Sequence, residues 1–169
     1  GQMPVFLCAG TQDKICGKEC KNFFEKTLDC FGVAADNIYS VMDKMAVEDT
    51  DNCSLSVDTR FCGTRRDPDI KGAILQITED NFTPQQLTRG FLMGMCRELY
   101  AFYEQMEKLT GKKRTHLVGS GNGVRKNKIS QHYLEETFKM PLEIPANTEE
   151  AAFGAAVFVS RNLKNKITG

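Results

Sequence analysis

A short apolar segment that runs into a glycine-rich turn and then into a helical segment sets the strongest limit on the fold. Residues 115–118 (THLV) are typical of a buried strand, and residues 124–138 carry apolar side chains at helical spacing. Between them lie three glycines in five residues, Gly119, Gly121 and Gly123. Strands that pass directly into helices are the units from which α/β sheets are built. We therefore predict an α/β fold with this loop at the carboxyl end of a strand.

The rest of the chain mixes short apolar runs with amphipathic segments. The best-defined helix begins at Thr83, a good N-cap that is followed by Pro84 and by Gln86 in a capping-box arrangement, and it ends near Gly111. Gly32 occupies a C-cap position after an earlier helical stretch. The predicted strands are 4–9, 53–57, 72–77, 115–118 and 141–145. The predicted helices are 17–31, 35–49, 83–111, 124–138 and 149–163.

These elements predict one domain over residues 1–169, a sheet flanked by helices, because no linker or low-complexity segment divides the chain. The 83–111 helix is expected to lie in the core. Its inward stripe is predicted as Leu87, Phe91, Met95, Leu99, Phe102 and Met106.

Composition excludes several classes of function. Lys plus Arg and Asp plus Glu both total 22, so the net charge is zero and no basic face for nucleic acid is predicted. No stretch approaches the roughly 20 apolar residues that span a membrane, and the start lacks a signal-peptide pattern. A cytoplasmic protein is therefore expected. The seven cysteines are odd in number and contain no CxxC pair, which favours reduced thiols over a disulfide framework or a metal site. A redox role for Cys16 and Cys20 is the weaker alternative.

The glycine loop has the chemistry of a nucleotide site. Glycine lets the backbone adopt positive φ and lets a ring or phosphate approach without a Cβ in the way, and the amides of Asn122 and Asn127 suit a purine edge or a ribose. The spacing matches neither GxGxxG, since Val124 occupies the third glycine position, nor a Walker A loop. On the residues alone, a nucleotide site and a plain tight turn both stay open.

The last predicted helix carries very small side chains over two turns. These are Ala151, Ala152, Gly154, Ala155 and Ala156. Such a face favours tight packing of this helix on the sheet, with contact to a ligand as the alternative.

A resemblance to a known family links these pieces. The segment HLVGSGNGVRKNKISQHYLEETFKMPLEIPANTEEAAFGAAV (His116–Val157) resembles the adenosine-binding segment and closing helix of the FGGY carbohydrate kinases. The stretch TRFCGTRRDPDIKGAILQI resembles the loop and strand that contain the family's Gly-x-Arg-x-x-Pro element, and ICGKECKNFFEKTL resembles the first helix of the same lobe. The sedoheptulokinase-like members are the most similar, with a Gly-Ser-Gly followed by Arg/Lys-Asn.

The resemblance implies an actin-like ATPase, or ribonuclease-H-like, lobe with a mixed sheet flanked by helices. Family members have two such lobes, and this chain resembles only the C-terminal, ATP-binding one. The catalytic base and most sugar contacts lie in the N-terminal sugar-binding lobe, so no catalytic residue and no metal ligand is assigned here. The nucleotide-binding residues that the resemblance implies are Gly119, Ser120, Gly121, Asn122, Gly123, Asn127 and, near the phosphates, Gly17.

The implied activity of the complete protein is transfer of the γ-phosphoryl group from ATP, with Mg²⁺, to a hydroxyl of a ketose, with sedoheptulose as one candidate. The isolated lobe is expected to bind ATP or ADP weakly and to be inactive. It is also expected to expose an apolar face that favours a homodimer. The alternative is a nucleotide-binding or interaction module of the actin-like superfamily without sugar kinase activity. Neither the sugar nor the natural length of the chain follows from the sequence.

Overall fold

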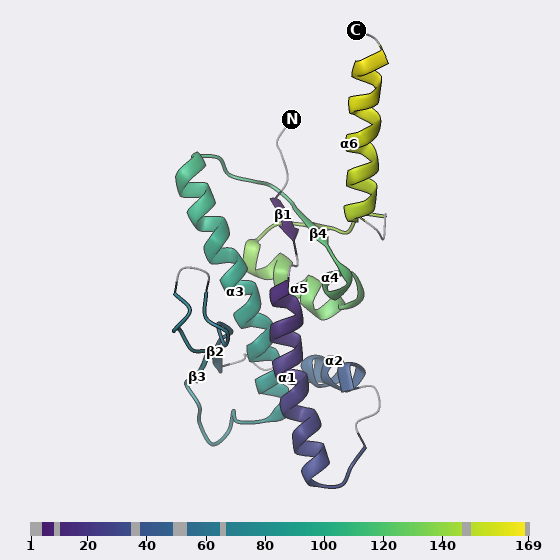
Figure 1. The fold of residues 1–169 in the computed structure, drawn as a ribbon. Helices are drawn as coiled ribbons and strands as arrows, with labels where there is room; N and C mark the ends of the chain where they lie inside the picture. The colour runs from purple at the N-terminus through teal and green to yellow at the C-terminus, as the bar shows by residue number, and fades with distance from the viewer. Residues whose placement is uncertain are drawn as a thin grey trace.

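The computed structural model describes residues 5–8, 11–34, 38–48, 54–64, 67–146 and 150–167. Within these ranges the chain consists of helices and short strands, as Figure 1 shows. The strands are β1 (Val5–Cys8), β2 (Ser56–Asp58), β3 (Ala73–Leu75), β4 (Leu117–Ser120) and β5 (Leu142–Glu143). The helices are α1 (Thr11–Cys30), α2 (Ile38–Glu48), α3 (Pro84–Thr110), α4 (Asn122–Lys126), α5 (Lys128–Phe138) and α6 (Glu150–Ile167).

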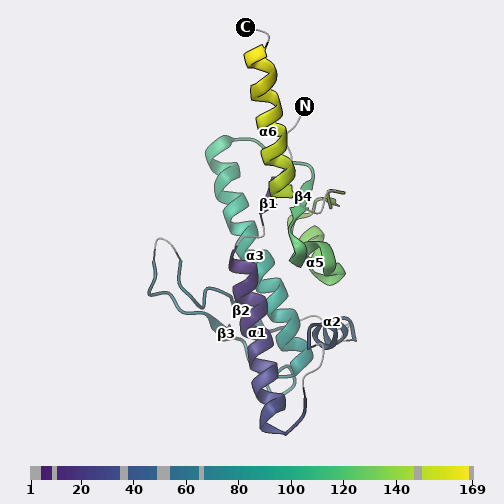
Figure 2. The same ribbon diagram turned by 45° about the vertical axis from the view of Figure 1, so that its right-hand side comes forward.

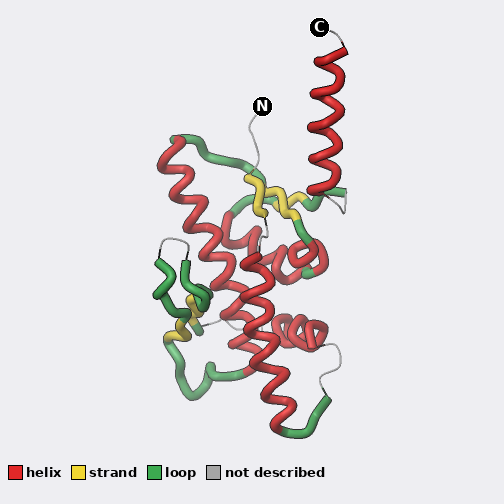
Figure 3. The backbone as a smooth tube through the Cα atoms, viewed as in Figure 1, coloured by secondary structure: helices red, strands yellow, loops and turns green. Residues whose placement is uncertain are grey.

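Within the described part of the chain the strands form two separate sheets instead of one mixed sheet. The order in the larger sheet is β1-β4-β5, and both of its pairings are parallel. β4 is therefore its central strand, with Leu117 opposite Val5 on one side and Leu142 on the other. The smaller sheet is the antiparallel pair β2–β3. The predicted α/β class is confirmed, and Figure 3 shows how small the strand content is relative to the helices.

Helix α3 is the central support of the fold. It contacts α1, α2, β2 and α5, an arrangement that can be followed in Figures 1 and 2. One buried cluster joins α1, α2 and α3, and it consists of Cys20, Phe24, Ile38, Met42 and Leu87. A second cluster joins α3, β4, α4 and α5, and it consists of Cys96, Tyr103, Leu117, Val124, Tyr133, Leu134 and Phe138.

The ends of α3 follow the sequence prediction closely. The Thr83 side chain accepts a hydrogen bond from the Gln86 N–H at 3.2 Å, and Gly111 ends the helix with a φ of 65°. The reciprocal half of the predicted capping box is taken by the backbone, because the Thr83 N–H donates to the Asn81 carbonyl at 2.9 Å. The predicted inward stripe is wrong at Phe102, which is 53% exposed, since the buried line passes through Cys96 and Tyr103.

Helix α1 begins six residues earlier than predicted, at Thr11 instead of Gly17. The prediction placed the start where the regular apolar spacing begins, but residues 11–16 belong to the same helix. The end agrees with the prediction. Gly32 has a φ of 66°, and the Val33 N–H donates to the Leu28 carbonyl at 3.0 Å, as in a Schellman cap.

Candidate nucleotide-binding site

The glycine-rich segment forms a sharp turn from the central strand into a helix. β4 continues through Gly119 to Ser120, Gly121 makes the turn, and α4 starts at Asn122. Gly121 has φ 100° and ψ 156°, a conformation that residues with a Cβ rarely adopt. This turn lies at the carboxyl end of β4, which is where open α/β sheets bind their ligands.

The three glycines have three different roles, which corrects the prediction of one bare loop. Gly119 lies in β4 and is buried, and a Cβ at this position would lie 2.9 Å from Val124 Cγ1 and 3.0 Å from Ile144 Cδ1. Its small size therefore serves packing of the strand against α4 and the segment after β5. Gly123 lies inside α4. Of the three, Gly121 is the one with positive φ.

Asn127 divides a segment that the sequence predicts as one helix over 124–138. Its backbone is extended, with φ −103° and ψ 99°, so α4 ends before it and α5 begins after it. Its side-chain oxygen accepts hydrogen bonds from the Ile129 N–H at 3.0 Å and the Ser130 N–H at 2.8 Å. The prediction of a continuous helix is wrong here because a good N-cap residue starts a new helix inside a helical pattern.

The amide nitrogen of Asn127 reaches a residue distant in sequence. Asn127 Nδ2 donates to Asp43 Oδ1 on α2 at 2.9 Å, across 84 positions of the chain. Burial raises the pKa of the Asp43 carboxyl, and the hydrogen bond from Asn127 partly offsets that rise. The contact ties α2 to the junction of α4 and α5.

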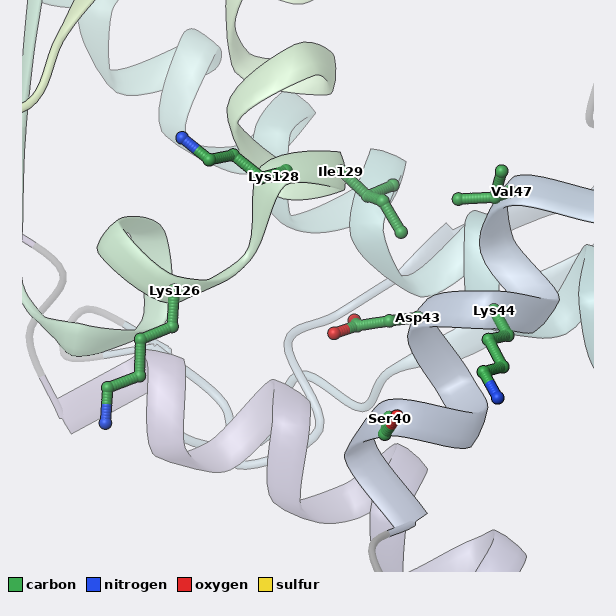
Figure 4. A pocket seen from close by; sticks show the side chains of 7 residues that line it. All are labelled: Ser40, Asp43, Lys44, Val47, Lys126, Lys128 and Ile129. Carbon is green, nitrogen blue, oxygen red and sulfur yellow. The ribbon is translucent and has the colours of Figure 1, made fainter.

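A pocket of about 470 Å³ lies between α2 and this junction. Figure 4 shows its lining residues, Ser40, Asp43, Lys44, Val47, Lys126, Lys128 and Ile129. The Asp43 carboxylate points from α2 toward the α4–α5 segment, whereas the ammonium groups of Lys126 and Lys128 point away from Asp43. The volume lies in the range of small-molecule sites, roughly 300–1,000 Å³.

The structure brings only part of the predicted site set together. Gly119 through Asn127 form one continuous strand–turn–helix segment beside the pocket. Gly17 lies inside α1, beyond its first turn, and not at the start of the helix where the sequence analysis placed it. Cys8 pairs with Ser120 in parallel register, so β1 and β4 end at the same edge of the sheet. The start of α1 and the Gly121 turn both come after this edge.

The structure also bears on two other interpretations of the sequence, the redox role of Cys20 and the packing of the small-residue face of α6. Burial raises the pKa of the Cys20 thiol to about 12, the opposite of the reactive thiolate that a redox role requires. The small-residue face of α6 does not pack on the sheet as predicted. Ala152, Gly154, Ala155 and Ala156 are exposed, and a Cβ on Gly154 would meet nothing within 4 Å.

Comparison with known proteins decides the family. The sequence model of the FGGY family of carbohydrate kinases, C-terminal domain, matches residues 26–163. The chain belongs to the FGGY family. No curated protein matches it significantly. The match to the family begins after Gly17 and includes the glycine turn, the pocket residues and α6 through position 163.

Solved structures with a similar fold include kinases of xylulose and of glycerol. Glycerol kinase of Plasmodium falciparum with ADP superimposes with a TM-score of 0.67 at 18% identity, over 84% of this chain and 27% of that one. Xylulose kinase of Bifidobacterium adolescentis gives 0.60 at 20% identity, over 75% and 24%. The FGGY domain therefore spans about a quarter of the length of these proteins, and its actin-like, ribonuclease-H-like fold is confirmed.

Asp43 is the site residue that the sequence analysis missed. It lies on α2 between the apolar positions of an ordinary amphipathic helix, and no motif spacing connects it with the glycine turn. Only tertiary packing brings it to Asn127. No helix among the described residues is long and apolar enough to cross a membrane, and no group of three or more His, Cys, Asp or Glu gathers there.

Proposed function

We propose that this FGGY domain is the ATP-binding lobe of a carbohydrate kinase that transfers the γ-phosphoryl group of ATP to a hydroxyl of a ketose, with sedoheptulose as the candidate acceptor. The observation that supports this most strongly is the Gly121 turn at the carboxyl end of the central strand, next to a pocket of about 470 Å³. The family match supports this proposal, because carbohydrate kinases transfer a phosphoryl group.

In this proposal the adenosine lies along the turn formed by Gly119, Ser120, Gly121, Asn122 and Gly123, with Asn127 at the edge of the base. The positive φ of Gly121 keeps a Cβ out of the ribose path. The phosphates lead toward the start of α1, where unpaired N–H groups and the helix dipole favour negative charge. Gly17 would let them approach the flank of that helix.

The residues fit a nucleotide better than they fit a resident metal. Backbone N–H groups and amide side chains can hold ribose and phosphate oxygens, whereas the described residues contain no cluster of three metal-binding side chains. Mg²⁺ would enter with the ATP phosphates and neutralise their charge. We infer that this lobe holds and orients ATP, and that the acceptor sugar and its catalytic base belong to a second lobe.

Nucleotide binding is tested by thermal shift of this chain with ADP and with MgATP. A ligand that binds only the folded state adds RT ln(1 + [L]/Kd), about 2.7 kcal/mol at a hundredfold excess over Kd. We expect a saturable rise in Tm and, with ketoses added, no sugar phosphate. The Gly121→Val, Asn122→Ala double variant should lose the rise, measured from its own ligand-free Tm.

The matched control is Gly32→Ala. Gly32 also has positive φ, but it lies at the end of α1 with nothing within 4 Å of an added Cβ. This variant should lower the ligand-free Tm and keep the full nucleotide shift. Equal shifts for the double variant and the unsubstituted chain would reject the glycine turn as the binding site, and the absence of any shift at several millimolar nucleotide would reject nucleotide binding by this lobe.

A further inference from the structure

We propose that Gln131 is a positioning residue for nucleotide binding: its side-chain amide holds the break between α4 and α5 and thereby fixes the Gly121 turn in the form that receives the nucleotide. This inference rests on the proposed function and deepens it, because Gln131 lies outside the glycine-rich segment and acts on it through the backbone of α4. Sequence spacing gives no sign of this role, since Gln131 occupies an ordinary polar position of α5.

Helix α4 is too short to be stable by itself. It has five residues, Asn122–Lys126, and its first turn is closed by the Arg125 N–H, which donates to the Gly121 carbonyl at 3.0 Å. Isolated helices shorter than about 12–15 residues are marginal in water. The turn that leads into α4 therefore depends on contacts that α4 makes with the rest of the fold.

The side chain of Gln131 supplies hydrogen bonds that α4 lacks at its end. Gln131 Nε2 donates to the Val124 carbonyl at 2.7 Å and to the Arg125 carbonyl at 3.2 Å. The last four carbonyls of an α-helix have no partner within the helix, and these two are among them. The other end of the amide is held by Lys128, whose Nζ donates to Gln131 Oε1 at 3.3 Å. The amide therefore lies with its donor toward α4.

Asn127 and Gln131 together replace hydrogen bonds of a continuous helix. In an unbroken helix the Ile129 N–H would donate to the Arg125 carbonyl, four residues earlier. Here Asn127 Oδ1 accepts from the Ile129 N–H at 3.0 Å and from the Ser130 N–H at 2.8 Å. The Arg125 carbonyl receives Gln131 Nε2 in place of the Ile129 N–H. Each side of the break thus has its own side-chain cap.

Two further contacts connect α4 to the parallel sheet. Val124 is buried, and it is the side chain that a Cβ on Gly119 of β4 would meet at 2.9 Å. Arg125 Nη1 donates to the Pro145 carbonyl, just after β5, at 2.6 Å. With these contacts on one side and the Gln131 cap on the other, the backbone of α4 and the turn before it are ordered in advance. Binding then does not have to order them, and a preorganised site binds its ligand more tightly.

The test measures ADP affinity by isothermal titration of this chain and of three variants at one position. Gln131→Met keeps the approximate size and removes the donor, whereas Gln131→Glu places an acceptor against two carbonyls. We expect ADP to bind about threefold to tenfold more weakly to Gln131→Met, the range for a lost hydrogen bond, and more weakly still to Gln131→Glu. Gln131→Lys should bind within about twofold of the unsubstituted chain, because its ammonium can donate to both carbonyls.

Hydrogen exchange of the ligand-free proteins gives a second readout that does not depend on nucleotide. The amides of α4 should exchange faster in Gln131→Met than in the unsubstituted chain, because the helix opens locally more often. In Gln131→Lys they should return to the slower rate. Circular dichroism checks that each variant is folded at the temperature of the titration.

The control variant is Gly94→Ala, which disturbs the contact of α3 with β2, since a Cβ there would lie 2.3 Å from the Val57 carbonyl oxygen. It should lower the Tm and keep the ADP affinity of the unsubstituted chain, which separates lost stability from lost positioning. A lower Tm with unchanged ADP affinity in Gln131→Met would overturn the inference, as would equal weakening by Gln131→Met and Gln131→Lys. Failure of the unsubstituted chain to bind ADP would overturn the proposed function and this inference together.

Discussion

Asp43 carries a charge into a partly buried position, and this burial has a consequence for the stability of the fold. The carboxylate loses hydration on folding and regains one hydrogen bond, from Asn127. The loss is the larger effect, since the pKa of Asp43 is raised above 3.8. At neutral pH the charged form of Asp43 therefore lowers the stability of the fold.

This cost predicts a pH-dependent stability difference between the chain and Asp43→Asn. The folded state binds more protons than the unfolded state from 3.8 up to the raised pKa of Asp43, so Asp43 lowers the free energy of unfolding as pH rises through that window. The unsubstituted chain should lose stability relative to Asp43→Asn across it, and the difference should be constant at higher pH. Urea denaturation over a pH series measures this.

Asp58 is a suitable control, because its pKa is shifted in the opposite direction to that of Asp43. The hydrogen bond from the Arg60 guanidinium lowers the pKa of Asp58, with Arg60 Nε 2.8 Å from Oδ1. Its contribution should be present above 3.8 and lost as pH falls through the lowered pKa. Relative to Asp58→Asn, the unsubstituted chain should therefore gain stability as pH rises toward 3.8. The stability difference between the unsubstituted chain and each variant should change with pH in opposite directions for Asp43→Asn and Asp58→Asn. A change in the same direction for both would contradict the assignment of these pH dependences to the two carboxyl groups.

At the scale of elements, local signals in the sequence predicted helices and strands better than their junctions. Thr83, Gly111 and Gly32 marked true helix ends because caps are chemical features of single residues. Asn127 was missed because a cap inside a run of helical spacing looks like an ordinary polar position. The separation of β2–β3 from the parallel sheet, and the burial of Gly119 by Val124 and Ile144, depend on tertiary packing.

The close contact of α3 with β2 leads to a prediction about Gly94. A Cβ there would lie 2.3 Å from the Val57 carbonyl oxygen, a backbone atom that cannot move aside cheaply. Gly94→Ala should lower the free energy of unfolding by about 1–3 kcal/mol, as overpacked sites do. Chemical denaturation gives the value, with the slope m checked for constancy.

Gly154→Ala is the matched control, because it makes the same substitution in a helix where a Cβ meets nothing within 4 Å. Alanine is the better helix former by about 1 kcal/mol, so this variant should be as stable as the unsubstituted chain or more stable. A destabilisation equal to that of Gly94→Ala would mean that the helix–strand contact is not the cause.

In the molecule as a whole, several large apolar side chains are left exposed to solvent. Two buried clusters lie along α3, and the parallel sheet has only short strands. Helix α6 projects away from this body in Figures 1 and 2, and its Phe153 and Val159 are 55% and 54% exposed. The prediction that the small-residue face of α6 packs on the sheet is wrong, because helical periodicity carries no information about which surface, if any, covers a face.

This exposed face predicts self-association of the chain in solution. Apolar patches beyond a few hundred Å² are rare on monomers and mark contact surfaces, so the apparent mass should rise with protein concentration in sedimentation experiments. Phe153→Lys with Val159→Lys should lower it to the monomer value, since burying either lysine in a contact is costly. Leu109→Lys, an equally drastic change at a residue that is 88% exposed on the last turn of α3, should leave association unchanged. Equal effects of the α3 and α6 substitutions would show nonspecific association through general apolar surface, and a constant monomer mass at all concentrations would contradict self-association through α6.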